Sequence, residues 1–330
     1  MSDNTKIEWT DATWNPITGC AVVSPGCTNC YAMKLAGTRL KNHRSREGLT
    51  VETKSGPVWN GKVRLNAEWM EQPLRWSRPR MIFVCAHGDL FAEGVPDEWI
   101  DMVFAVMASA PQHTFQVLTK RPERMRDYLF ARRHLPFPNI WLGTSAEDQP
   151  RYSARWPFME DIAERGWMVW VSAEPLLGPL DLLATPLRKV GPDGKAHLAR
   201  PPMWVVAGGE SGPGARPMHP DWTRALRDQS QIHGIPFLFK QWGAWKPVPW
   251  KLERTETETD AEYIERSEKE CSTHALSRTG YLIELDHKPW SWARVLPQPD
   301  THHAVKLVGK KVAGRVLDGV EHNAFPEGRA

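Results

Sequence analysis

Short apolar runs recur along the first 245 residues, and each is followed by a polar turn and then by a stretch with helical spacing. The runs are rich in β-branched and aromatic residues and do not alternate with polar ones, which is typical of strands buried on both faces. They are Met81–Ala86, Thr114–Leu118, Asn139–Leu142, Trp167–Val171, Met203–Ala207 and Pro236–Phe239. We expect a further strand over Pro16–Gly19, ahead of these.

Apolar residues at helical spacing lie between these strands. They predict helices over Asp97–Ser109, Pro122–Leu135, Gln149–Glu164 and His219–His233, and a first helix over Asn29–Asn42. Strands that alternate with helices form a parallel sheet with right-handed crossovers. Six or seven such units predict an α/β fold with a full or partial TIM-type (βα) barrel, and a doubly wound open sheet is the alternative.

The alternation stops after Trp245. We therefore divide the chain into a barrel domain of residues 1–245 and a C-terminal extension of residues 246–330 that packs on the barrel. We expect residues 48–78 to form an insertion over the mouth of the barrel and residues 181–202 to form a loop or small hairpin. The charged stretch Lys251–Ser277 predicts a solvated segment. The basic tail Lys306–Gly319 either reaches phosphate groups or returns to cover the barrel.

Composition narrows the class of protein only modestly. A net charge of +3 and a pI near 8.6 permit an anionic partner without requiring one. The N-terminus is polar and no apolar run reaches the length of a membrane span, so we expect a cytoplasmic protein with no membrane association. We expect most of the 17 tryptophans to be core residues. The sequence leaves the oligomeric state open.

Three cysteines lie within eleven residues, at Cys20, Cys27 and Cys30. An odd number of thiols without an export signal argues against disulfides. One alternative is a structural zinc site with Cys85 or His87 as the fourth ligand. The other is an iron–sulfur cluster in which three thiolates leave one iron open. Because the triad follows the first predicted strand, on the side where barrels bind ligands, we favour the cluster and expect Cys85 to be a core thiol.

Polar residues follow every predicted strand, and ligands bind at the carboxyl ends of the strands in α/β folds. We predict catalytic roles for Glu174, Glu210 and Lys240. The predicted cofactor-binding residues are Asp89, Thr144, Ser145, Ser172, Glu174, Gly208 and Gly209. Glycine at 208 and 209 lets backbone N–H groups approach a ligand closely. The alternative is that these turns are polar only because they are turns, with Ser or Thr capping the next helix.

Positive charge follows the same strand ends, at Lys120, Arg121, Arg216 and Lys240. These side chains suit a carboxylate or a phosphate. An equally good interpretation is ion pairing with Glu147, Glu174 and Glu210. Trp242, Trp245 and Trp250 either stack on a nucleobase or pack in the core.

Several motifs in order carry a resemblance to a known family. They are WNPITGC, SPGCTNCYA, HGDLF, VLTKRPERM, WLGTSAEDQ, VSAEPLLGPL, VVAGGESGPGARPMHPDW, FLFKQWG and GKKVAGRVLDG. Together they resemble a phage-associated family of unknown function that is described by its three-cysteine motif. A cysteine triad after the first strand of a βα barrel is also similar to the radical S-adenosylmethionine (radical SAM) enzymes.

The radical SAM resemblance implies a role for each of these residues. Cys20, Cys27 and Cys30 would hold a [4Fe-4S] cluster, and Asp89 would bind the ammonium group of S-adenosylmethionine. Thr144, Ser145, Ser172 and Glu174 would hold its ribose. The first cysteine spacing is six residues where three is common, and Asn29 precedes the last cysteine where an aromatic residue is usual, although Tyr31 follows it.

The resulting expectation is an iron–sulfur, SAM-dependent radical enzyme that takes electrons from a donor. Its substrate is unknown, and a nucleic acid or nucleotide is weakly favoured. A zinc-containing protein that binds or processes nucleic acid without radical chemistry is the alternative. A third hypothesis is a catalytically inert partner protein of a mobile element.

Overall fold

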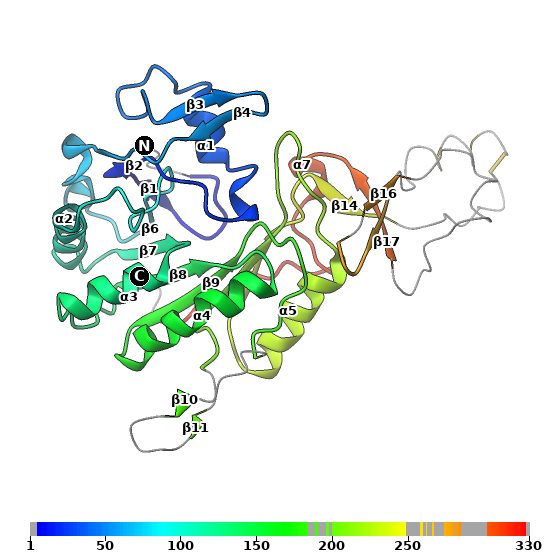
Figure 1. Ribbon diagram of the computed structural model, residues 1–330. Coiled ribbons are helices and arrows are strands. Elements are labelled where there is room, and N and C mark those ends of the chain that lie inside the picture. Colours follow the sequence, from blue (N-terminus) through cyan, green and yellow to red (C-terminus); the bar gives the residue numbers. More distant parts are fainter. Residues whose placement is uncertain are drawn as a thin grey trace.

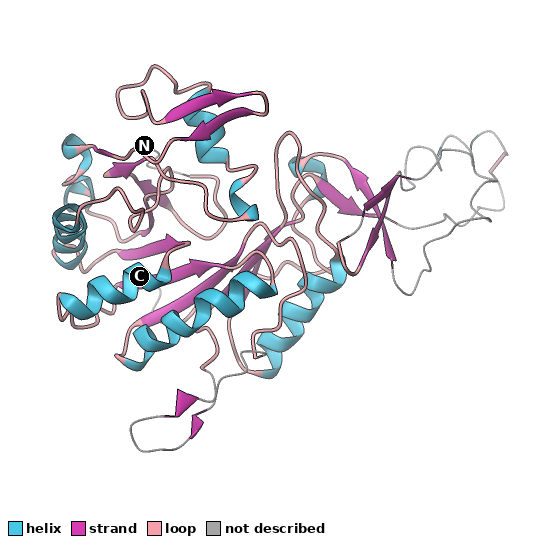
Figure 2. Cartoon of the chain, viewed as in Figure 1, coloured by secondary structure: helices cyan, strands magenta, loops and turns pink. Residues whose placement is uncertain are grey.

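The computed structural model describes residues 5–183, 189–190, 196–197, 200–248, 258–259, 262, 266, 274–280, 282–284 and 302–327. A seven-stranded parallel sheet organises most of them (Figures 1 and 2). Its strands, in spatial order, are β1 (Ala12–Trp14), β6 (Met81–Val84), β7 (Thr114–Thr119), β8 (Ile140–Ser145), β9 (Met168–Ala173), β12 (Val205–Gly208) and β13 (Phe237–Gln241). The sheet curls but its first and last strands do not pair, so the expected α/β fold is confirmed as a partial barrel.

Four helices connect consecutive strands of this sheet, as the hydrophobic spacing predicts. They are α2 (Asp97–Ala108), α3 (Pro122–Ala131), α4 (Gln149–Glu164) and α5 (Pro220–Ile232). Proline occupies the first or second position of α3, α4 and α5, where its missing N–H costs nothing. The first helix, α1 (Tyr31–Gly37), is shorter than the predicted Asn29–Asn42.

The first strand differs from its prediction. Ala12–Trp14 pairs with β6 in the main sheet, whereas Ile17–Thr18 (β2) leaves it and pairs antiparallel with β5 (Arg64–Leu65). Pro16 separates the two segments and has no N–H to donate to a ladder. The chain returns at Gly19, which bridges to Gly88 beyond the end of β6. The cysteine triad thus follows β2, with the main-sheet strand a few residues earlier.

The predicted insertion builds a small lobe next to α1. A hairpin of β3 (Thr50–Thr53) and β4 (Gly56–Trp59) packs on that helix, with Trp59, Leu49 and three residues of α1 forming a separate apolar cluster. Three 3-10 helices lie before and after this lobe in the chain. They are η1 (Pro25–Cys27) in the cysteine loop, and η2 (Ala67–Trp69) and η3 (Gln72–Arg75) after the hairpin.

The two faces of the main sheet bury different residues. Val169 and Val171 of β9 belong to the large core beneath the helices, whereas Trp170 between them faces the opposite side. That opposite face carries Trp9, Trp141, Trp170 and Trp204, which contact one another edge to face or at a tilt. A Cβ at Gly143 would lie 2.4 Å from the Trp170 ring, so glycine makes room for it. The expectation that most tryptophans are core residues is therefore confirmed for the described part of the chain.

A second sheet begins where the βα alternation ends. It is four-stranded and antiparallel, in the order β14 (Trp245–Pro247), β17 (His302–Leu307), β15 (His274–Ser277) and β16 (Leu282–Glu284). The short helix α7 (Lys310–Ala313) follows. Most of the stretch predicted to be solvated, Lys251–Ser277, and Trp250 lie outside the described residues. At its described end the prediction is wrong, because Ala275 and Leu276 of β15 are buried. Within residues 181–202, β10 (Lys189–Val190) and β11 (Ala196–His197) form the expected hairpin.

The C-terminal tail returns to the main sheet instead of extending into solvent. His322 and Ala324 exchange backbone hydrogen bonds with Phe239 and Phe237 of the edge strand β13. Trp204 donates from Nε1 to the carbonyl of Ala324, and Phe325 lies on the Trp204 ring. Within the predicted tail Lys306–Gly319, the carbonyls of Gly314 and Val316 accept from the backbone and indole N–H groups of Trp242, so this stretch covers the end of β13. No helix among the described residues is long and apolar enough to cross a membrane.

Candidate functional site

One pocket opens at the carboxyl ends of the parallel strands. Its volume is about 230 Å³. The predicted site residues that line it are Cys20, Cys27, Cys30, Asp89, Ser145, Ser172, Glu174, Gly209, Glu210 and Lys240. Trp9, Phe83 and Leu118 form an apolar part of the wall, continuous with the tryptophan-lined face of the sheet.

Two predicted cofactor-binding residues, Thr144 and Gly208, do not line this pocket. Successive side chains of a strand point to opposite faces, so Ser145 faces the pocket and Thr144 faces the helices. The Thr144 hydroxyl donates to the carbonyl of Thr119 instead. Gly208 lies below the pocket wall, where a Cβ would be 2.9 Å from Oε1 of Glu174.

The cysteine triad is partly enclosed. Cys27 is buried, while Cys20 and Cys30 are partly exposed. Burial and then the Asp89 carboxylate raise the pKa of the Cys20 thiol to about 12, while Arg121 acts in the opposite direction. Nη1 of Arg121 donates to the Cys20 sulfur at 3.6 Å. A thiol in such a place needs a bound cation, or a strong local positive charge, to ionise near neutral pH.

The chemistry of the donor set tests which metal group it fits. The three thiols are close enough for Cys27 and Cys30 to raise the pKa of Cys20. A structural zinc site needs four protein ligands. In a cluster each thiolate binds a different iron, and three thiolates leave one iron open. Three thiols that line one pocket suit such a cluster.

Glu147, which the sequence suggests only as an ion-pair partner, also holds the cysteine loop. Glu147 is fully buried after β8, and its Oε1 accepts a hydrogen bond from the backbone N–H of Gly26 at 3.2 Å. Its Oε2 accepts from Arg155 at 2.8 Å. Burial works to raise the pKa of Glu147, but Arg155, with help from Ser24, outweighs it and holds the pKa at about 2. Glu147 is therefore an ionised anchor beside Cys27.

Glu210 is a second anchor for the same loop. Its carboxylate forms a bidentate ion pair with Arg216, with distances of 2.6 and 2.9 Å, and also accepts from Nδ2 of Asn29. Arg216 in turn donates to the carbonyl of Pro25 at 3.0 Å. Both oxygens of Glu210 are thus engaged in joining the turn after β12 to the cysteine loop. This arrangement matches the ion-pair interpretation and favours a positioning role over the predicted catalytic one.

Glu174 and Lys240 form an ion pair at the base of the pocket. Nζ of Lys240 lies 2.8 Å from Oε1 of Glu174, and Nε1 of Trp9 donates to Oε2 at 3.2 Å. Ser172 donates to the same Oε2. The carboxylate is held from three strands or their ends, so the pair is preorganised inside the pocket.

Asp89 and Arg121 form another buried pair, next to Cys20. Asp89 accepts hydrogen bonds from the side chains of Thr119 and Arg121 and from the backbone N–H groups of Phe91 and Lys120. Four donors therefore share its two oxygens. Lys120 donates from Nζ to the hydroxyl of Ser145 at 3.1 Å and brings a cation to the pocket wall.

Neither residue considered as a fourth zinc ligand lines the pocket. Cys85 is 2% exposed, and burial raises the pKa of its thiol to about 12. His87 accepts a hydrogen bond at Nδ1 from the buried Arg46, at 2.8 Å. Burial and then Arg46 lower the pKa of His87 to about 4.

Trp242 and Trp245 are buried too, and each indole donates to a backbone carbonyl.

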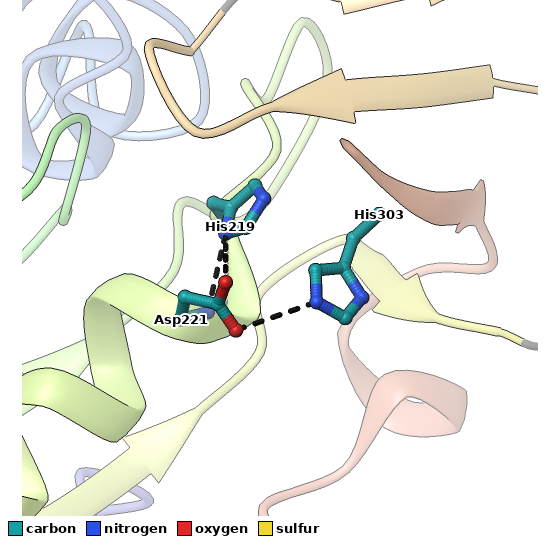
Figure 3. Close-up of side chains that lie close together, drawn as sticks. All are labelled: His219, Asp221 and His303. Atoms are coloured by element: carbon teal, nitrogen blue, oxygen red, sulfur yellow. Dashed lines mark hydrogen bonds and ion pairs between the residues drawn. The ribbon is translucent and has the colours of Figure 1, made fainter. Parts of the chain in front are cut away.

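One other group of candidate metal ligands occurs among the described residues, away from this pocket. Figure 3 shows His219, Asp221 and His303, which join the start of α5 to β17. Nδ1 of His219 accepts from the backbone N–H of Asp221 and so caps the helix. Arg224 and Arg278 each lie about 3 Å from the Asp221 carboxylate. These guanidinium groups already neutralise the Asp221 carboxylate. We therefore interpret the two histidines, Asp221 and the two arginines as a polar contact that joins α5 to the second sheet, and we call it the clasp.

The comparisons with known proteins identify the family to which the chain is similar. A family model described as "Protein of unknown function (DUF5131)" matches residues 4–326. No curated protein sequence matches the chain. Among solved structures, a Cys-to-Ser mutant of spore photoproduct lyase has a TM-score of 0.37 and 12% identity, with 70% of this chain and 64% of that chain covered. A mutant of the same lyase with bound AdoMet and dinucleoside spore photoproduct has the same TM-score and identity, with 66% and 60% covered. The chain thus spans less than two thirds of the length of these lyases.

Proposed function

We propose that this chain, which belongs to the DUF5131 family of proteins of unknown function, is an iron–sulfur enzyme of the radical SAM type. Cys20, Cys27 and Cys30 would hold a [4Fe-4S] cluster, and the pocket beside them would bind S-adenosylmethionine. When bound, such a cluster supplies one electron for cleaving S-adenosylmethionine, and the electron itself comes from a separate donor.

The observation that carries this proposal is the placement of the three thiols. All three line one pocket at the carboxyl ends of the parallel strands, whereas neither Cys85 nor His87, considered as a fourth zinc ligand, lines it. A structural zinc site would need that fourth ligand, whereas a cluster held by three thiolates keeps one iron open.

The remaining pocket residues suit the binding of a polar cofactor. Ser145 and Ser172 offer hydroxyl groups and Glu174 offers a carboxylate, whereas Gly209 lines the pocket with its N–H already donated to the carbonyl of Gln241. Asp89 is the predicted partner of the cofactor ammonium, and its existing bond to Arg121 holds its carboxylate next to Cys20. We assign the catalytic contribution to Glu174 and Lys240, whose paired charges can bind a reacting polar group or pass a proton between Nζ and Oε1.

Anaerobic purification followed by analysis of iron, sulfide and zinc tests the proposal. We expect close to stoichiometric iron and sulfide and a brown protein. Cys27→Ala should lose the iron, whereas the matched substitution Cys85→Ala, of a buried thiol outside the pocket lining, should retain it. A colourless protein with one zinc ion and no iron would refute the cluster.

A further inference from the structure

Positive charge is concentrated in one part of the chain. Residues 31–64, which comprise α1, the β3–β4 hairpin and the start of β5, contain eight Lys and Arg and only two Glu. The rest of the chain contains 34 Lys and Arg against 37 Asp and Glu. We call residues 31–64 the basic lobe. It carries an excess of six positive charges in a protein whose other residues are slightly acidic.

Most of this charge is open to solvent. Arg39, Lys41, Lys54 and Lys62 are exposed, and none of the four forms an ion pair with any described residue. Arg44 is exposed as well and pairs with Glu68 at 2.8 Å. Like charges concentrated in one lobe repel one another, and this cost is recovered when an anionic partner binds.

The basic lobe adjoins the cysteine pocket, and Figure 1 shows α1, β3 and β4 together at one side of the main sheet. Tyr31 and Trp59 from the lobe line the pocket. The backbone N–H of Gly61, next to Lys62, donates to the carbonyl of Cys20 at 3.2 Å. On the other side of the loop, Lys34 donates to Oδ1 of Asn29. A polyanion bound to the lobe would therefore pass close to the pocket.

The exposed ring of Tyr31 favours a nucleic acid over an acidic protein as the anionic partner. Its side chain is 49% exposed although it lines the pocket. Its hydroxyl donates to the carbonyl of Ala86, and its ring meets the His87 ring at 83°. The ring is thus fixed in orientation while much of it faces solvent. Fixed aromatic rings beside basic surfaces are the platforms on which unpaired bases stack.

We propose that the basic lobe binds the backbone of a single-stranded nucleic acid and that Tyr31 stacks on one of its bases. The substrate would then be a nucleotide within a strand, delivered to the cysteine pocket. A single strand is required because the base faces of a duplex are already stacked. The delivery step rests on the proposed function, whereas the binding surface does not.

Binding of a labelled single-stranded oligonucleotide to the full chain, measured by fluorescence anisotropy at several salt concentrations, tests the surface. The variant replaces Arg39, Lys41, Lys54 and Lys62 with Gln. The matched control replaces four exposed arginines that precede strands, at the opposite end of the barrel: Arg78, Arg133, Arg165 and Arg200. For the lobe variant we expect weaker binding and a shallower slope of log K against log salt, by about 0.7 for each phosphate group that the variant no longer neutralises. The control should keep the native slope.

Stacking is tested by comparing Tyr31→Phe with Tyr31→Leu. The first keeps the ring and should bind almost as the native protein does, while the second should bind about 5- to 150-fold more weakly. Equal losses of affinity in the lobe and control variants, or binding of polyglutamate as tight as that of the oligonucleotide, would overturn the proposal. Iron content measured on the same samples separates the two hypotheses. Iron without oligonucleotide binding refutes only the docking surface, and binding without iron refutes only the cluster.

Discussion

Gly208 and Gly209 are consecutive residues whose tolerance for a side chain differs sharply. At Gly209 a Cβ would lie 1.9 Å from the carbonyl oxygen of Trp242, which is backbone and cannot move freely. At Gly208 the nearest atom is the carboxylate end of Glu174, at 2.9 Å, which can shift. Sequence reasoning assigned both glycines to cofactor binding, yet each also serves close packing.

We predict that Gly209→Ala lowers the free energy of unfolding by about 3 kcal/mol or more, because relief of the clash needs a backbone shift. Gly208→Ala should cost about 1 kcal/mol, because only the Glu174–Lys240 pair must adjust. Urea unfolding of both variants measures the difference. Similar values for the two would show that the turn after β12 is softer than its contacts indicate.

At the scale of elements, the cysteine loop is held by anchors from β8 and β12 rather than by its own fold. We predict that Glu147→Gln lowers iron content and destabilises the protein by about 3 kcal/mol or more, because Arg155, itself 8% exposed, loses its charge partner. Glu71→Gln, which changes an exposed carboxylate paired with the exposed Arg75, serves as the control and should cost about 1 kcal/mol or less. Native iron content in Glu147→Gln would contradict the anchoring role.

The C-terminal tail acts as an additional strand along the edge of β13. We predict that Phe325→Ala lowers the free energy of unfolding by about 2 kcal/mol, because Phe325 covers the Trp204 ring. Val320→Ala changes an exposed side chain of the same tail and should stay within about 0.5 kcal/mol of the native protein. Thermal unfolding of the pair, with light scattering to detect exposure of the sheet edge, checks this role.

At the scale of the whole molecule, the clasp between the two sheets makes stability depend on pH. Burial and then His303 lower the pKa of His219 to about 4, against 6.5 for an unperturbed histidine. Protonation would put an N–H at Nδ1, where the ring now accepts from the backbone N–H of Asp221. Between pH 6.5 and 4 the unfolded chain binds a proton that the folded one does not, so stability falls as the pH falls through this range.

We predict a loss of about 3 kcal/mol from this histidine between about pH 7 and pH 4. His219→Asn retains a helix-capping side chain and should show a smaller loss. Part of the dependence would persist in the variant, because burial also lowers the pKa of His87 to about 4. Thermal unfolding at about pH 7 and pH 4 measures both proteins. Equal pH dependence would exclude the clasp as its origin.

The sequence by itself determined the order of strands and helices, because periodicity is a local property that each segment carries. The limits of α4 agree with the predicted Gln149–Glu164, and the cysteine triad lies at the pocket as expected. Strand β1 has three residues, too few to show a hydrophobic pattern. The first strand of the main sheet was therefore predicted at the position of β2.

Only the tertiary structure decided which polar residues face the pocket and which are already engaged. In strands buried on both faces, hydrophobicity does not distinguish Thr144 from Ser145, so register alone places one of them in the pocket. One partner of Glu147 and one of Glu210 lie 121 and 181 residues away, at Gly26 and Asn29. Local patterns carry no record of such distant contacts. The same holds for the tail, whose pairing with β13 depends on an edge that exists only once the sheet has formed.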